Sequence, residues 1–166
     1  LDIGVVVGGH PVQKFEGFIA GYPMRIPMVD VSAVAAGGGS LAIVDDIGFI
    51  QVDRESAGSI PGPACYGRGG IDATVTDANL VLGRIDPRYF LGGNMTLDVA
   101  QAEQAVARLA NELNMDPGDL AAGIVQVVNA KMAQAIRTIT VERGIEPRDF
   151  AIVAFGGAGP MHAAAL

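Results

Sequence analysis

The sequence predicts an α/β protein with a β-meander in its first third and a helical second half. Valine-rich segments punctuated by glycine turns fill residues 1–52, a pattern typical of short strands. After residue 98, apolar residues recur at three- and four-residue spacing, which indicates amphipathic helices. Near the end, a continuous apolar run leads directly into glycines, and this pattern predicts a strand, a turn and a helix.

The predicted meander has three turns. Leu1 to Val12 is expected to form a hairpin around Gly8-Gly9-His10, because valines flank the glycine pair. A second β-rich region runs from about Met28 to Val52 and is interrupted at Gly37–Ser40 and at Asp45–Gly48.

Two helices have clear boundary signals. Asp98 followed by Gln101 resembles a capping box and predicts a helix from residue 99. Asp116 as cap with Pro117 at the first position predicts a second helix, which Gly144 should end. The apolar stripe of that second helix comprises Leu120, Ile124, Val127, Val128, Met132, Ile136 and Ile139.

The segment after the second helix is a candidate ligand site. Ala151–Phe155 is predicted to be a strand covered on both faces, and Gly156–Pro160 a turn before a helix that starts at Met161. Ligands of open α/β sheets bind at this edge, where glycines allow close approach to the backbone. The alternative is a purely structural corner. His162 could contact a nucleotide or substrate, or could be satisfied by neighbouring backbone.

Composition excludes several classes of protein. A net charge of −7 and a pI near 4.6 argue against nucleic-acid binding. No run approaches the ~20 apolar residues of a membrane-spanning helix, and a signal peptide is not expected, because no basic segment precedes an apolar one at the start. The single cysteine, Cys65, excludes an internal disulfide framework and favours the cytoplasm. With two histidines and one cysteine, a zinc site of nitrogen and sulfur ligands is not expected.

The low charged fraction of 17% suggests surfaces that face other parts of a larger protein. The chain begins at Leu1 rather than at a methionine, so we expect a domain truncated at both ends.

Three short stretches carry polar groups suited to phosphate chemistry, and each has a structural alternative. Backbone amides of Gly37–Ser40 could form an anion-binding concavity, or the stretch could be a plain hairpin loop. Asp77 could help hold a metal–phosphate complex, or Thr76 or Asp77 could cap a short helix. Asp2 is open to the same two interpretations.

Ser56–Gly70 is rich in glycine and proline and can form neither a helix nor a central strand. A linker is one interpretation, but Ile60, Cys65 and Tyr66 prefer burial and favour an ordered functional loop. A nucleophilic Cys65 would need a nearby base and a lowered pKa. A buried small residue that shapes the loop is the favoured role.

Four segments together resemble the hydantoinase A/5-oxoprolinase family: AAGGGSLAIVD at 35–45, ESAGSIPGPACYGRGG at 55–70, TVTDANLVLGRID at 74–86 and FGGAGPMHA at 155–163. The resemblance covers essentially the whole chain. It implies part of a lobe similar to those of actin, sugar kinases and heat-shock ATPases, with two lobes closing on ATP and Mg²⁺.

The resemblance also implies roles for individual residues. Asp2 would be the last acidic residue of a phosphate-binding turn, and Asp2 and Asp77 are the candidate catalytic carboxylates. Gly156, Gly157, Ala158 and Gly159 would receive the adenosine. Gly37, Gly38, Gly39 and Ser40 would lie near the phosphates or at the lobe interface. No metal ligand is assigned.

The implied activity is ATP-dependent ring opening of a cyclic amide such as 5-oxoproline, hydantoin or N-methylhydantoin, by phosphoryl activation of the amide oxygen. A second, hydantoinase B-type subunit or domain would complete the hydrolysis in an oligomer. One alternative is the activating subunit of an acetone or acetophenone carboxylase. Another is a non-catalytic nucleotide-binding or assembly module.

Overall fold

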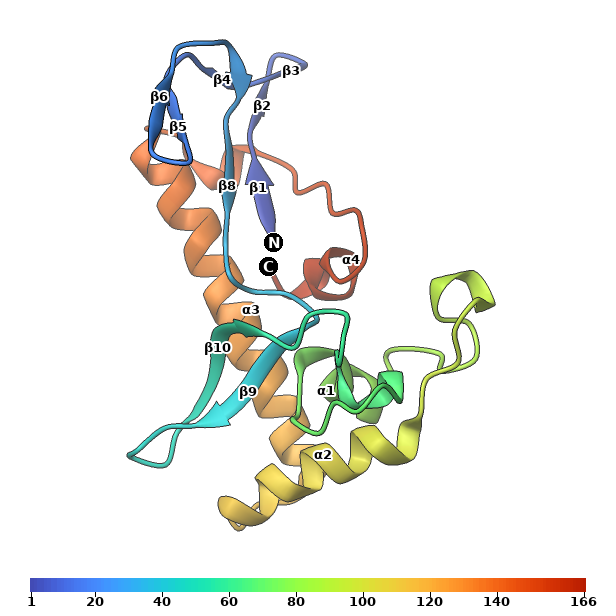
Figure 1. Ribbon diagram of the computed structural model, residues 1–166. Coiled ribbons are helices and arrows are strands. Elements are labelled where there is room, and N and C mark those ends of the chain that lie inside the picture. The colour runs from blue at the N-terminus through green and yellow to red at the C-terminus, as the bar shows by residue number, and fades with distance from the viewer. The chain divides into compact units, whose positions relative to one another are not determined.

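A computed structural model describes the backbone of residues 1–166 and the side chains of all of them except residues 53 and 54 (Figure 1). The chain divides into two compact units. The first comprises Leu1–Val34 and Gln134–Ala151, and the second comprises Ala35–Ala133 and Ile152–Leu166.

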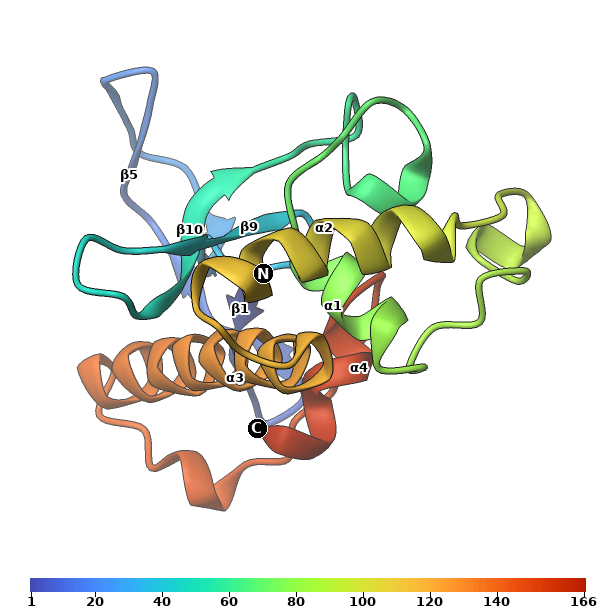
Figure 2. The same ribbon diagram turned by 90° about the horizontal axis from the view of Figure 1, so that it is seen from below.

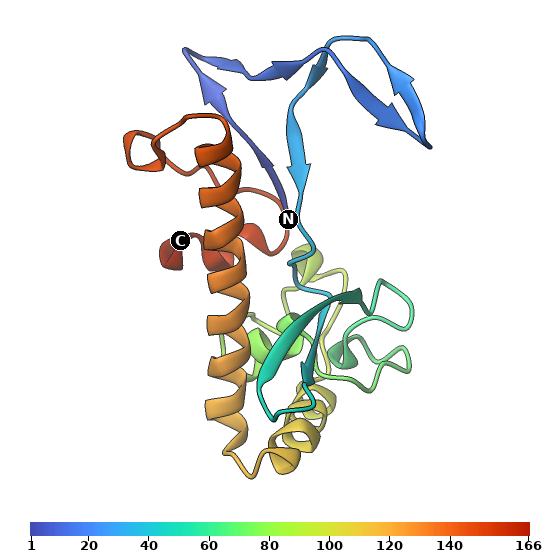
Figure 3. The ribbon, with the colours of Figure 1, turned by 90° about the vertical axis from the view of Figure 1, so that its left-hand side faces the viewer.

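The first unit is made of strands that pair antiparallel and in twos, β1 with β8, β2 with β3, β4 with β7 and β5 with β6 (Figure 3). These strands are β1 (Asp2–Gly4), β2 (Val6–Val7), β3 (His10–Pro11), β4 (Gln13–Lys14), β5 (Gly17–Ile19), β6 (Tyr22–Met24), β7 (Met28–Val29) and β8 (Val31–Ala33). The predicted single meander is therefore wrong in its pairing. The first strand bonds to a segment about thirty residues away, a partner that local turn signals cannot identify.

Two tight hairpins explain much of this unit. Gly8 and Gly9 have φ values of 58° and 81°, as a two-residue turn between twisted strands requires. The predicted hairpin is confirmed, although His10 lies in the strand after the turn. A second hairpin turns at Ala20-Gly21, with φ values of 50° and 83°, and the sequence analysis missed it. In the sequence, this hairpin is marked only by Gly21, between two short apolar segments.

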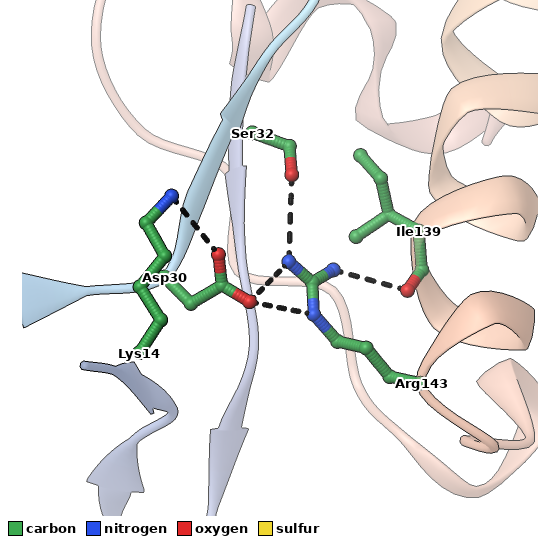
Figure 4. A network of polar contacts seen from close by, with 5 residues as sticks. All are labelled: Lys14, Asp30, Ser32, Ile139 and Arg143. Atoms are coloured by element: carbon green, nitrogen blue, oxygen red, sulfur yellow. Dashed lines mark hydrogen bonds and ion pairs between the residues drawn. The ribbon is translucent and has the colours of Figure 1, made fainter. Parts of the chain in front are cut away.

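One charged network ties strands of the first unit to the end of helix α3 (Pro117–Glu142) (Figure 4). Arg143 donates from Nε and Nη2 to Oδ2 of Asp30, at 2.9 and 2.6 Å. It also donates to the carbonyl of Ile139, which belongs to the last turn of the helix. Lys14 lies 3.5 Å from the other carboxylate oxygen. The hydrogen bonds from Arg143, more than the charge of Lys14, lower the pKa of Asp30.

The second unit contains one strand pair, β9 (Ser40–Val44) with β10 (Ile50–Ser56). The turn between them is confirmed where Asp45–Gly48 predicted it. The Asp45 carboxylate accepts from the amides of Ile47 and Phe49, at 3.1 and 2.8 Å. Because β8 pairs with β1 and β9 pairs with β10, Gly37–Ser40 is not a hairpin loop.

The helices of the second unit are α1 (Val75–Val81), α2 (Val99–Glu112), the first part of α3 and α4 (Gly159–His162) (Figure 2). Both predicted starts are confirmed. The Asp98 carboxylate accepts from the amide of Gln101, and the Asp116 carboxylate accepts from those of Gly118 and Asp119. Within the described part of the chain, no helix combines the length and apolarity needed to cross a membrane.

The core of the second unit is built from the apolar stripes of these helices and from β10. Its fully buried side chains include Val52, Val75, Val106, Leu120, Ile124 and Val128. Small residues such as Ala102 and Ala110 lie on the buried face of α2, which allows close approach of its neighbours. The contacts between α1 and α2 place the short helix over this core.

The predicted buried strand Ala151–Phe155 is wrong. The segment has no regular structure, and Val153 and Phe155 are 82% and 86% exposed. A strand exists only where a neighbouring strand accepts and donates its backbone hydrogen bonds. No described strand pairs with this segment, so its apolar composition alone does not make it a strand. A turn and a helix do follow it as predicted, but α4 begins at Gly159 rather than at Met161.

Candidate functional site

The first glycine turn, Gly37–Ser40, leads into β9 and is closed by its own serine. The amide of Gly37 donates to Oγ of Ser40 at 3.2 Å, and the amide of Ser40 donates to the carbonyl of Gly37 at 3.1 Å. The amides of Gly38 and Gly39 have no protein acceptor among the described residues. Two adjacent free amides on a glycine turn are donors available to an anion.

Glycine is required at two positions of this turn because other atoms occupy the space of a side chain. A Cβ at Gly38 would lie 2.7 Å from Oγ1 of Thr76, and one at Gly39 would lie 2.7 Å from Oγ of Ser56. Thr76 donates to the carbonyl of Gly38 from its amide and from its hydroxyl, at 2.8 and 2.9 Å. The turn is thereby fixed directly on the first residues of α1.

The second glycine turn, Gly156–Gly159, meets the first. The Cβ of Ala158 lies 3.7 Å from the place that a Cβ on Gly38 would take. Gly157 and Gly159 have open space where a side chain would be, and the amides of residues 156–158 have no acceptor among the described residues. The structure therefore brings together the two stretches that the sequence analysis assigned to nucleotide binding.

Asp77 has a different position from the one expected of a phosphate or metal ligand. Its side chain is fully buried and accepts four hydrogen bonds, from the amides of Ala64, Cys65 and Thr74 and from the hydroxyl of Thr74. The distances run from 2.7 to 3.2 Å. Of the two interpretations left open, the structure favours the capping one, with Thr74 rather than Thr76 or Asp77 as the capping residue.

These bonds order the glycine-proline loop, Ser56–Gly70. Residues Gly62–Cys65 are buried, and the carbonyl of Cys65 accepts from the amide of Asp98 at 2.8 Å. The linker interpretation is therefore wrong and the ordered loop is confirmed, although Ile60 is 80% exposed. In the sequence, the feature that could have predicted this role of Asp77 is its place in a capping box, at the third residue of α1 after the capping residue Thr74.

Cys65 is not a nucleophile in this environment. The thiol is fully buried, and burial raises its pKa far above the ordinary range, as does the negative charge of Asp77 to a smaller extent. A thiolate is the reactive form of cysteine, and here it is strongly disfavoured. The favoured interpretation, a buried residue that shapes the loop, agrees with the structure.

His162 is fully buried and bonds to a side chain rather than to neighbouring backbone. Its Nδ1 lies 2.7 Å from Oδ1 of Asn129 on α3, whereas its Nε2 has no partner among the described residues. Burial, and then the nearby positive charge of Arg84, lower the pKa of the imidazole. The sequence analysis missed Asn129. It could have been noticed as a polar residue among the buried apolar residues Val125, Val128 and Met132 of one helix.

Asp2 is exposed in β1, opposite Ala33, and belongs to the first unit, whereas both glycine turns belong to the second. A phosphate-binding or catalytic role for Asp2 stays a prediction. Among the described residues, no three histidine, cysteine, aspartate or glutamate side chains are grouped so as to hold a metal ion.

Comparisons with known proteins agree on one family. The family model described as hydantoinase/oxoprolinase matches residues 1–166. Caprolactamase subunit alpha of Pseudomonas jessenii is 42% identical over 98% of this chain and 23% of its own length. 5-Oxoprolinase 1 of Arabidopsis thaliana is 41% identical over 95% of this chain and 14% of its own length.

A solved structure is similar over nearly the whole chain. The nucleotide-free structure of acetone carboxylase, from work on ATP-dependent acetone carboxylation, has a TM-score of 0.86 and 29% identity. The match covers 99% of this chain and 23% of that one. The chain thus spans about a quarter or less of the length of the proteins it resembles.

Proposed function

The chain belongs to the hydantoinase/oxoprolinase family, and we propose that the full-length protein couples ATP hydrolysis to the ring opening of a cyclic amide. The observation that carries this proposal is the meeting of the two glycine turns, with free backbone amides on both. Relatives named 5-oxoprolinase and caprolactamase support a lactam as the class of substrate.

The two turns suit a nucleotide for a physical reason. Backbone amides that are already fixed in place stabilise phosphate charge without the cost of ordering flexible side chains. Ser40 and Thr76 hold the first turn, so its amides at Gly38 and Gly39 keep their direction when a ligand arrives. The open space beside Gly157 and Gly159 allows a ligand to approach the backbone of the second turn.

Transfer of the γ-phosphoryl group of ATP to the amide oxygen would make the carbonyl carbon open to attack by water, with Mg²⁺ neutralising charge on the phosphates. The C–N bond would then break, the ring nitrogen would leave as an amine, and a second water would hydrolyse the resulting acyl phosphate to carboxylate and phosphate. An unstrained lactam resists direct attack because its amide bond is stabilised by resonance. The described residues include no cluster of three metal-ligating side chains, and the four hydrogen bonds to Asp77 use its carboxylate inside the protein. Ligands of the Mg²⁺ ion would therefore come from phosphate oxygens, water and residues of the full-length protein outside this chain.

The direct test is Mg²⁺-dependent ATP hydrolysis by the full-length protein together with its partner subunit. Separate reactions would contain no substrate, 5-oxoproline, hydantoin, N-methylhydantoin or caprolactam. Stimulation by one cyclic amide, with formation of the ring-opened product, is the expected result. ATP binding without stimulation by any of them would count against ring opening, and no turnover with a ketone and bicarbonate either would favour a non-catalytic nucleotide-binding module.

A second candidate function rests on the similarity to acetone carboxylase. In that case the protein would be the ATP-using subunit of a ketone carboxylase. ATP turnover that requires both a ketone, acetone or acetophenone, and bicarbonate would support this function and exclude the first.

A matched pair of variants tests whether the glycine turns bind the nucleotide. Gly38→Ala places a Cβ against Thr76, whereas Gly37→Ala meets no atom within 4 Å. We expect Gly38→Ala to weaken ATP binding about tenfold, roughly 1.4 kcal/mol, and Gly37→Ala to change it little. Equal affinities of the two variants and the unaltered protein would remove the first turn from the site.

A further inference from the structure

The buried pair of His162 and Asn129 has no role in the function proposed above. His162 has no exposed surface and lies on a four-residue helix at the end of a glycine turn. Burying a polar side chain costs free energy unless it is hydrogen-bonded. Asn129 is likewise an unusual residue for its position, because asparagine is a poor helix former and its neighbours on this face of α3 are apolar. Their 2.7 Å contact explains both positions.

The chemistry of the contact fixes the protonation of the imidazole. With Oδ1 of Asn129 facing Nδ1 of His162, the hydrogen belongs on Nδ1, because an amide oxygen only accepts. Nε2 is then a bare acceptor in the neutral ring. In the charged ring it would be a buried N–H with no partner among the described residues, which would cost more.

The pair lies next to the second glycine turn. His162 is one helical turn beyond Ala158, and the amide of Met161 donates to the carbonyl of Ala158 at 3.1 Å. The Cβ of Ala158 in turn lies 3.7 Å from the place that a Cβ on Gly38 would take, beside the first glycine turn. A displacement of His162 would therefore move the second turn relative to the first.

We propose that His162 is a positioning residue: its Nδ1–H bond to Asn129 holds the second glycine turn against the first. This inference rests on the proposed nucleotide site, because the turn it positions is the one assigned to ATP. The imidazole does not touch the nucleotide, since its surface is closed by protein. It acts through α4 and the backbone of the turn.

Three variants of the full-length protein separate the hydrogen bond from mere bulk. His162→Asn puts an amide nitrogen where Nδ1 was, whereas His162→Gln puts it near the place of Nε2. Asn129→Leu replaces the acceptor with an apolar side chain of similar size on α3. His10→Gln, at the exposed histidine of β3, is the matched control.

Hydrogen exchange of two hydrogen-bonded amides is the first measurement: that of Met161, which donates to the carbonyl of Ala158 in the second turn, and that of Thr76, which donates to the carbonyl of Gly38 in the first. We expect His162→Gln and Asn129→Leu to speed this exchange at least tenfold, and His162→Asn to remain within about threefold of the unaltered protein. In the unaltered protein, nitrogen NMR of the imidazole should show the hydrogen on Nδ1. If His162→Gln does not fold, Asn129→Leu decides by the same measurement.

The kinetic consequence is the second measurement. The KM for ATP should rise about tenfold in His162→Gln and Asn129→Leu, with kcat changed less than threefold, because the turn is misplaced while the reacting groups are intact. Unchanged exchange in both variants, or a hydrogen on Nε2, would overturn the proposal. If the unaltered protein proves not to bind ATP, the proposed function fails, while exchange and NMR still decide whether His162 positions the turn.

Discussion

The glycine-proline loop and the apolar segment of residues 151–155 differ in their burial and in the hydrogen bonds that fix their backbones. The loop contains no long helix, yet Ala64 and Cys65 are almost fully buried and donate to the carboxylate of Asp77. The apolar segment has the composition of a core strand, yet Val153 is 82% exposed and no amide of residues 151–155 finds an acceptor among the described residues. Long-range hydrogen-bond partners, rather than local composition, decided which of the two is firmly placed.

The largest expected effect is the loss of the buried carboxylate. Asp77→Ala would leave three amides and one hydroxyl without their acceptor. Each buried donor left unsatisfied costs about 1–3 kcal/mol, so we expect the free energy of unfolding to fall by about 4 kcal/mol. Urea denaturation measures it.

Asp77→Asn should cost less, because one acceptor oxygen remains, and Asp72→Ala, at an exposed residue after the loop, is the control. A stable Asp77→Asn protein that lacks all activity would contradict the structural role and support the catalytic role that the sequence suggested.

A pair of glycine substitutions compares the loop with the second glycine turn, which directly follows the apolar segment. A Cβ at Gly70 would lie 2.1 Å from the carbonyl oxygen of Gly62, whereas a Cβ at Gly157 would meet no atom within 4 Å. We expect Gly70→Ala to lower the thermal midpoint, at a cost of about 3 kcal/mol, and Gly157→Ala to change it little. Equal effects would mean that the loop is no more constrained than the second glycine turn.

The buried thiol predicts a pH dependence. Because the pKa of Cys65 is raised in the folded protein, folding keeps the proton on sulfur. The unfolded thiol loses its proton near pH 8.5, so stability should fall above that pH by about 1.4 kcal/mol per unit. Below pH 8.5 this group has no effect.

Urea unfolding of the unaltered protein and of Cys65→Ala between pH 8 and 10 checks the prediction. The difference in slope between the two proteins should appear only on the alkaline side. Identical slopes would show that Cys65 titrates normally and is accessible to solvent.

The smallest effect is expected in the apolar segment. Val153→Thr exchanges side chains of similar shape at an exposed position, so the free energy of unfolding should change by less than about 0.5 kcal/mol. Thermal denaturation of the full-length protein measures the change. A loss well above 1 kcal/mol would mean that the segment is covered there, and the contrast between the two regions would have to be abandoned.

Much of the local structure could be predicted from the sequence. The starts of α2 and α3 follow from Asp98 and Asp116, whose carboxylates accept amides two or three residues away. The Gly8-Gly9 hairpin and the end of α3 at Gly144 follow from positive φ angles that glycine adopts without strain. The four family segments likewise led to the family that the comparisons support.

The candidate site could be predicted only in part. The two glycine turns were identified as separate stretches, but their approach near Gly38 and Ala158 involves residues 120 positions apart (158 − 38). The same holds for Asn129 with His162 and for Asp30 with Arg143, which are 33 and 113 positions apart.

The sequence by itself determined the caps, the tight turns and the periodic helices, because each depends on atoms within a few residues of one another. Only the tertiary structure decided that Asp77 binds the loop, that Asn129 orients His162 and that residues 151–155 stay unpaired. These features depend on which hydrogen-bond donor lies next to which acceptor from a distant part of the chain. Many residue pairs of the same types could satisfy that requirement, and folding selects one of them.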